Sequence, residues 1–171
     1  MKIVLGPGAS RNPVQLDPHA RALRAAGHDV EIVTLPRGSA ETAVPVFTAR
    51  SGAAVVAGGQ SFGGRVASLA AASGSRFAGL LLFSYPLHRP GLPDQLRTAH
   101  WPRLDLPVLL LMGDRDPFCD MTVLERELVK LPSARLLVYP GAGHGLKGHL
   151  EEALSDAAAW LADLSRYPPV R

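Results

Sequence analysis

Short, continuously apolar runs recur along this chain and alternate with longer stretches of helical spacing. A strand covered on both faces is apolar at successive positions, whereas a strand with one solvent-facing side alternates. The apolar runs occupy residues 2–5, 30–34, 53–57, 79–83, 108–112 and 135–138, and the helical stretches occupy residues 14–26, 39–51, 62–73, 122–130 and 150–164. Because strands and helices alternate in this way, the sequence predicts βαβ units and an α/β fold with a parallel sheet.

The segment 84–107 breaks the alternation. It holds prolines at positions 86, 90, 93 and 102 before Pro107 opens the next apolar run. A proline lacks the backbone donor that a helix needs, so we expect a long excursion here with one short helix near residues 94–100. The chain shows no repeat, low-complexity stretch or linker, and its 171 residues suit one domain, residues 1–171.

Charge, hydropathy and cysteine content exclude several classes of protein. The formal net charge is +3, and the arginines are scattered from Arg11 to Arg171, so no nucleic-acid partner is expected. The apolar runs are too short to span a bilayer, and the N-terminus lacks the long apolar region of a secretory leader. The single cysteine, Cys119, precludes an internal disulfide. We therefore expect a cytoplasmic protein that does not enter a membrane.

The most informative motif lies between an apolar run and an alanine-rich helical stretch. Gly59-Gln60-Ser61-Phe62-Gly63 matches G-x-S-x-G. This pattern is typical of a sharp strand-to-helix turn that strains a serine and projects its hydroxyl over the sheet. Glycine is needed two residues before and two residues after the serine, because side chains there would collide. We predict that Ser61 is a nucleophile.

Two nucleotide-binding motifs fit the chain poorly. Residues 59–66 nearly match the phosphate loop G-x4-G-K-[ST], but Arg65 replaces the lysine and Val66 has no hydroxyl for magnesium. The glycines at residues 6–8 follow the first apolar run but lack the third glycine of a dinucleotide fingerprint. Neither motif indicates a nucleotide.

A histidine on the last strand-end loop is the expected general base, which a serine nucleophile requires. His144 is flanked by Gly143 and Gly145 after the last apolar run. Since ligand sites of parallel sheets lie beyond the carboxyl ends of the strands, this loop is expected to reach Ser61. Of the remaining histidines, His88 is the one expected to line a pocket, and structural roles are expected for His19, His28, His100 and His149.

Two aspartates after the fifth apolar run compete for the role of orienting acid. Asp116 is held by Pro117 and is better placed to reach across a loop, whereas Asp114 is able to pair with a neighbour or cap a turn. We favour Asp116. The resulting chain order of Ser61, Asp116 and His144 is the order found in α/β-hydrolases and differs from the orders of the major serine proteases.

An acyl-transfer site also needs an oxyanion hole made of backbone donors. One donor is expected to be the N–H of Phe62, the residue after the nucleophile. The other is expected from the loop after the first apolar run. Pro7 has no N–H and is excluded. Ala9 is the first choice, and Gly8 is the alternative.

Over nearly its whole length the sequence resembles the α/β-hydrolase superfamily, and most of all the compact branch of dienelactone hydrolases and small carboxylesterases. The resemblance implies a three-layer, doubly wound sheet of six parallel strands in the order 2-1-3-4-5-6, which is a minimal α/β-hydrolase fold without a large cap. Dienelactone hydrolases have cysteine where this chain has Ser61. The segments that carry the resemblance are residues 7–10, 59–65, 83–88, 113–118 and 141–144.

This resemblance implies a serine esterase acting on small esters or thioesters, as a monomer or homodimer, without a metal or organic cofactor. Aromatic and apolar side chains would wall its pocket, and the expected substrate-binding residues are Tyr85, Leu87, His88 and Phe118, with Phe62 and Trp101 as further candidates. Two other functions stay open. The fold also serves as a catalytically silent binding or scaffold subunit, and perhydrolase chemistry uses the same three residues.

Overall fold

A single sheet of six parallel strands forms the centre of the computed structural model, which describes residues 1–166. The strands lie in the order β2-β1-β3-β4-β5-β6, as predicted. Every neighbouring pair is parallel, with Gly6 opposite Gly59 in the register of β1 and β3. The strands are β1 (Lys2–Gly6), β2 (Asp29–Ile32), β3 (Val55–Gln60), β4 (Gly79–Phe83), β5 (Val108–Gly113) and β6 (Ala134–Tyr139).

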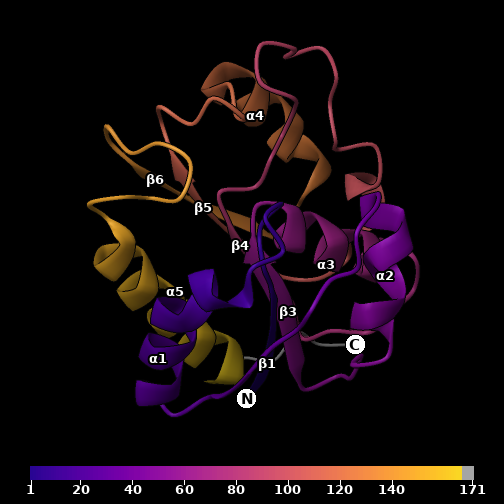
Figure 1. The fold of residues 1–171 in the computed structure, drawn as a ribbon, viewed down its shortest axis with the longest axis vertical. Helices are drawn as coiled ribbons and strands as arrows, with labels where there is room; N and C mark the ends of the chain where they lie inside the picture. The colour runs from indigo at the N-terminus through magenta and orange to yellow at the C-terminus, as the bar shows by residue number, and fades with distance from the viewer. Residues whose placement is uncertain (167–171) are drawn as a thin grey trace.

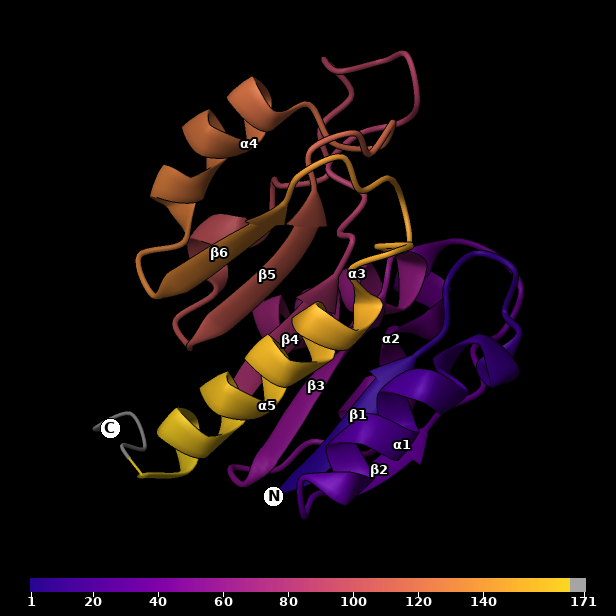
Figure 2. The same cartoon turned by 90° about the vertical axis from the view of Figure 1, so that its left-hand side faces the viewer.

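Helices cover both faces of the sheet, which explains why its strands are continuously apolar. Figure 2 shows α1 (Asp17–Ala25) and α5 (Leu150–Arg166) on one face, with α2 (Ala40–Thr48), α3 (Phe62–Ala72) and α4 (Met121–Glu127) on the other. Successive residues of one strand enter the two cores in turn. In β4, Leu80 and Leu82 pack under α3, whereas Leu81 and Phe83 pack under α5. No helix among residues 1–166 is long and apolar enough to cross a membrane.

The predicted helix near residues 94–100 is wrong. The excursion 84–107 instead runs beyond the carboxyl end of the sheet as turns, and its only helical part is the 3₁₀ turn Trp101–Arg103 (Figure 1). Backbone groups here bond to distant partners, because the Arg97 N–H donates to the Leu87 carbonyl and the Arg97 carbonyl accepts from the Tyr85 hydroxyl. These pairings replace the i→i−4 ladder that a helix would require.

The helical stretch predicted for residues 14–26 is divided. A 3₁₀ turn, Pro13–Leu16, comes first, and α1 restarts at Asp17 with Pro18 in its first turn. Proline is tolerated there because the first N–H groups of a helix have no intrahelical partner. The last helix runs to Arg166, and the Pro168-Pro169 stop expected after it lies outside the described residues.

β1, β3 and α3 approach one another closely at three glycines. A Cβ added to Gly59 would lie 2.1 Å from the Gly6 carbonyl oxygen, and a Cβ added to Gly63 would lie 2.0 Å from the same oxygen. Gly59 also has a φ of +142°, a conformation that side chains rarely adopt. The obstacle in each case is backbone, which cannot rotate away. The start of α3 is therefore held directly against the end of β1.

The substitution Gly63→Ala should destabilise the fold strongly, because the new methyl group forces β1 and α3 apart. Overpacking costs typically 1–3 kcal/mol, and a clash with backbone should give a loss of about 3 kcal/mol. Urea unfolding measures this loss. Gly143→Ala is the control, since its Cβ would lie 3.8 Å from the nearest non-local atom, the Arg115 carbonyl oxygen. A Gly63→Ala protein as stable as the control would show that the contact is not a constraint.

Two of the buried histidines, His19 and His100, have a lowered pKa. His19 packs edge-on against Phe83, with ring centroids 4.8 Å apart, and His100 forms a 2.8 Å hydrogen bond with the Ser68 hydroxyl. Their exposed fractions are 4% and 5%. Desolvation on burial lowers the pKa of each imidazole to about 4, well below the usual value of about 6.5. Both rings are therefore neutral in the folded protein at neutral pH.

This burial should make the fold acid-sensitive. Between about pH 6.5 and pH 4 the unfolded chain binds protons at these histidines and the folded chain does not, so stability falls as the pH falls through that window. The loss between pH 7 and pH 4.5 should reach a few kcal/mol for the two histidines together. In His19→Leu the loss should be smaller by roughly 2 kcal/mol. Urea unfolding at both pH values tests this, and an equal loss in the variant and the wild type would contradict it.

Candidate active site

Ser61 occupies a strained turn between β3 and α3. Its backbone has φ 49° and ψ −112°, in the left-handed half of the map that non-glycine residues avoid. Backbone hydrogen bonds fix it on both sides, because its N–H donates to the Phe83 carbonyl at 2.8 Å and its carbonyl accepts from the Arg65 N–H at 3.1 Å. The serine thus lies at the carboxyl end of the sheet and at the first turn of α3.

The loop after β6 brings His144 to an acid that follows β5. His144 Nδ1 lies 2.7 Å from Asp116 Oδ2, and the Asp116 side chain is completely buried. The other carboxylate oxygen accepts a 2.8 Å hydrogen bond from the Phe118 N–H. An ionised carboxylate has no proton to give, so Nδ1 carries the hydrogen and Nε2 keeps its lone pair. The ring is therefore fixed in the tautomer that a general base requires.

Asp114 has a different role from Asp116. Its Oδ1 accepts a 2.6 Å hydrogen bond from the Gly141 N–H, at the start of the loop that carries His144. It therefore shapes the backbone of the histidine loop and does not contact the ring. Of the two aspartates weighed from the sequence, the structure brings Asp116 to His144.

The histidine loop also rests on the turn that carries Ser61. A Cβ placed on Gly145 would lie 3.4 Å from the Gln60 side-chain nitrogen, and the Gly145 N–H donates to the Ser84 hydroxyl at 3.2 Å. The rings of His144 and Phe118 lie 4.5 Å apart. Among residues 1–166 no hydrogen bond joins Ser61 to His144, and such bonds are often loose in unliganded sites.

Ser84 was not found from the sequence. It follows β4 directly, is fully buried, and has a positive φ of 48° like that of Ser61. The signal that could have found it is its place at the end of a buried strand, where polar residues of parallel sheets face the ligand site. The separation of 61 residues from its partner Gly145 is what concealed its role.

The loop after β1 lies beside Ser61. A Cβ on Gly8 would lie 4.0 Å from the Ser61 Cβ, and Ala9 is exposed. The Ala9 N–H donates to no backbone carbonyl within residues 1–166. Phe62 is the first residue of α3, so its N–H has no intrahelical acceptor. Neither N–H group thus has a backbone acceptor in the described part of the chain, and both stay candidates for the oxyanion hole.

Several expected pocket residues lie in the core instead. Tyr85 and Trp101 pack with ring centroids 5.3 Å apart, and with Leu87 all three are at most 1% exposed. Burial raises the pKa of the Tyr85 phenol to about 12. Strand-end position alone did not reveal which of these side chains turn inward. Phe62 and Phe118 are partly exposed and remain candidates for contact with a substrate.

His88 has no ring nitrogen left for a ligand. Its Nδ1 donates to the Arg89 carbonyl at 2.7 Å, and its Nε2 accepts from the Asp120 N–H at 2.9 Å. The residue is 4% exposed. His88 therefore joins the excursion to the start of α4, which argues against the expected substrate contact.

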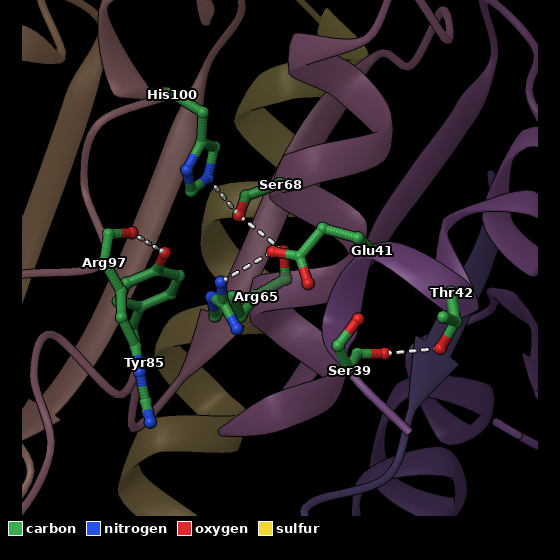
Figure 3. Close-up of polar contacts among 8 residues, drawn as sticks. All are labelled: Ser39, Glu41, Thr42, Arg65, Ser68, Tyr85, Arg97 and His100. Atoms are coloured by element: carbon green, nitrogen blue, oxygen red, sulfur yellow. Dashed lines mark hydrogen bonds and ion pairs between the residues drawn. The ribbon is translucent and has the colours of Figure 1, made fainter. Parts of the chain in front are cut away.

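A hydrogen bond holds the excursion against α3, and a second one joins two parts of the excursion to each other. Figure 3 shows the His100 ring bonded to Ser68 of α3, and the Tyr85 hydroxyl bonded to the Arg97 carbonyl at 2.8 Å. In the same view Arg65, one turn after Ser61, forms a 3.0 Å ion pair with Glu41 of α2. The excursion is thus fixed at its base as well as packed over the core.

Solved structures of other proteins share this fold. A monoacylglycerol lipase from Paleococcus ferrophilus superposes with a TM-score of 0.81 at 17% identity, over 95% of this chain and 94% of that one. Est1E from Butyrivibrio proteoclasticus gives 0.79 at 14% identity, over 96% and 88%. A thermophilic esterase from Thermogutta terrifontis gives 0.74 at 16% identity, over 96% and 90%.

At these identities the superpositions establish the fold. The family follows from the sequence itself, because a family model described as an alpha/beta hydrolase domain matches residues 37–165. That match contains the strained Ser61, the buried Asp116 and His144. The chain is a member of the alpha/beta hydrolase family.

Proposed function

We propose that this protein is a serine hydrolase that cleaves small carboxylic esters or thioesters through an acyl-enzyme on Ser61. The observation that carries the proposal is the 2.7 Å hydrogen bond from His144 Nδ1 to the buried Asp116, on a loop that rests against the Ser61 turn. A histidine held in this tautomer by a carboxylate beside a strained serine is the arrangement that activates a hydroxyl.

In the proposed reaction His144 Nε2 takes the proton of the Ser61 hydroxyl as the oxygen attacks the substrate carbonyl. The tetrahedral oxyanion accepts hydrogen bonds from the N–H groups of Phe62 and Ala9, with Gly8 as the alternative to Ala9. His144 then gives its proton to the departing alcohol or thiol. Water, deprotonated by the same nitrogen, releases the acid and restores Ser61.

The proposal of small substrates rests on the segment 84–107, which is too short to form a large cap. This segment is anchored to α3 and α4 by the contacts of His100 and His88. The names of two structural relatives, a monoacylglycerol lipase and an esterase, are compatible with ester cleavage. The cytoplasmic location expected from the sequence is part of the same proposal, and so is Phe118 as a substrate contact.

A fluorophosphonate probe should label the wild-type protein at Ser61 at neutral pH, because it reacts with a serine whose proton has a base to accept it. Mass spectrometry of the labelled peptide identifies the site, and Ser61→Ala should abolish labelling. Wild-type protein that stays unlabelled would refute the proposal and leave a binding role for the fold.

The two aspartates offer a matched pair of variants. Asp116→Asn should slow p-nitrophenyl acetate hydrolysis by about 10³–10⁴-fold, because an amide at this position favours the wrong tautomer of the histidine. Asp114→Asn keeps an oxygen that accepts from the Gly141 N–H, so its rate should stay within about tenfold of the wild type. Equal losses in the two variants would show that Asp116 has no special role.

A further inference from the structure

Arg11 links the two segments that supply the proposed oxyanion donors. We infer that Arg11 is a positioning residue that holds the N–H groups of Ala9 and Phe62 in one fixed arrangement. This inference rests on the proposed function, because it concerns the same site. It also assigns a purpose to a residue that the proposed reaction does not use.

The backbone of Arg11 closes the turn that contains Ala9. Its N–H donates to the Gly8 carbonyl at 2.9 Å, so residues 8–11 form one hydrogen-bonded turn. Its φ is +60°, which is unfavourable for a residue with a side chain and persists only where the surroundings impose it. The Ser10 hydroxyl adds two hydrogen bonds to this turn, since it donates to Gln15 at 2.8 Å and accepts from the Asn12 N–H at 3.3 Å.

The side chain of Arg11 reaches from this turn to the residue after the nucleophile. Its guanidinium carbon lies 3.4 Å from the centroid of the Phe62 ring, in stacking contact. Nη2 donates to the Gly38 carbonyl at 2.9 Å, on the loop after β2. A planar guanidinium is suited to stacking on an aromatic face while its edge donates hydrogen bonds. Three segments are thereby joined by one side chain.

One nitrogen of the guanidinium is closed to any ligand. Its Nη1 is fully enclosed and has no acceptor among residues 1–166. Burial lowers the pKa of Arg11, and leaving an enclosed donor unpaired costs stability. The packing of α3 on β1 does not depend on Arg11, because the contact of Gly63 with Gly6 already holds the two together. The role that remains for Arg11 is to fix the loop after β1 relative to Phe62.

Fluorophosphonate kinetics measure this role without knowledge of the natural substrate, since the phosphonyl oxygen occupies the oxyanion hole in the labelling step. Arg11→Met should lower the maximal rate of labelling about tenfold, less than the loss of a whole donor, and leave the concentration for half-maximal rate unchanged. Arg21→Met is the matched control, because Arg21 is exposed on α1. Arg11→Lys keeps a cation over the ring and should recover part of the rate.

A double-mutant cycle tests whether the effect passes through the Phe62 ring. Phe62→Leu keeps the backbone donor and removes the stacking partner, so Arg11→Met combined with Phe62→Leu should be no slower than the slower single variant. Multiplied effects, or a wild-type labelling rate in Arg11→Met, would overturn the inference while leaving the proposed function intact. A wild-type protein that the probe does not label would overturn both.

Discussion

The contact of one carbonyl, that of Gly6, with the backbones of Gly59 and Gly63 sets the geometry on which the rest of the site depends. It brings the carboxyl end of β1 against the first turn of α3. As a result the loop after β1 and the residue after Ser61 become neighbours. Glycine is required at residues 59 and 63 because no space is left for a side chain. In this G-x-S-x-G motif the requirement comes from the neighbouring strand β1 as much as from the turn itself.

The other half of the site depends on loops that share hydrogen bonds with strand ends. Asp114 accepts from Gly141, and Ser84 accepts from Gly145. The backbone on either side of His144 is therefore held by a side chain that directly follows a different strand. Asp116 then needs only to orient the ring. Such division of tasks suits a small domain, because each side of the histidine loop is fixed by a hydrogen bond to a residue that follows a neighbouring strand, and no large cap is needed.

The sheet could be predicted from the sequence because burial on both faces leaves a continuous apolar signature in every strand. The serine, aspartate and histidine could be proposed because glycines and strand ends mark their places. Tyr85 and Leu87 could not be assigned in this way, since their inward orientation follows from packing against Trp101 and has no sequence period. The absent helix near residues 94–100 has a similar cause, because long-range partners of the Arg97 backbone outweigh local helical bonding.

The conformation of the loop after β1 could not be predicted from the sequence either, and Arg11 shows why. Pro7 offers no N–H, Ala9 or Gly8 is the donor predicted from this loop, and a short loop rich in glycine has many conformations. The hydrogen-bonded turn closed by Arg11 selects one of them, and its stacking on Phe62 ties that choice to the helix that follows Ser61. The spacing of residues 7–11 does not predict the contacts of the Arg11 side chain, because their partners lie on two other segments. The proposed nucleophile can therefore be predicted from a local motif, whereas the surroundings of the proposed oxyanion depend on contacts between segments that are distant in the sequence.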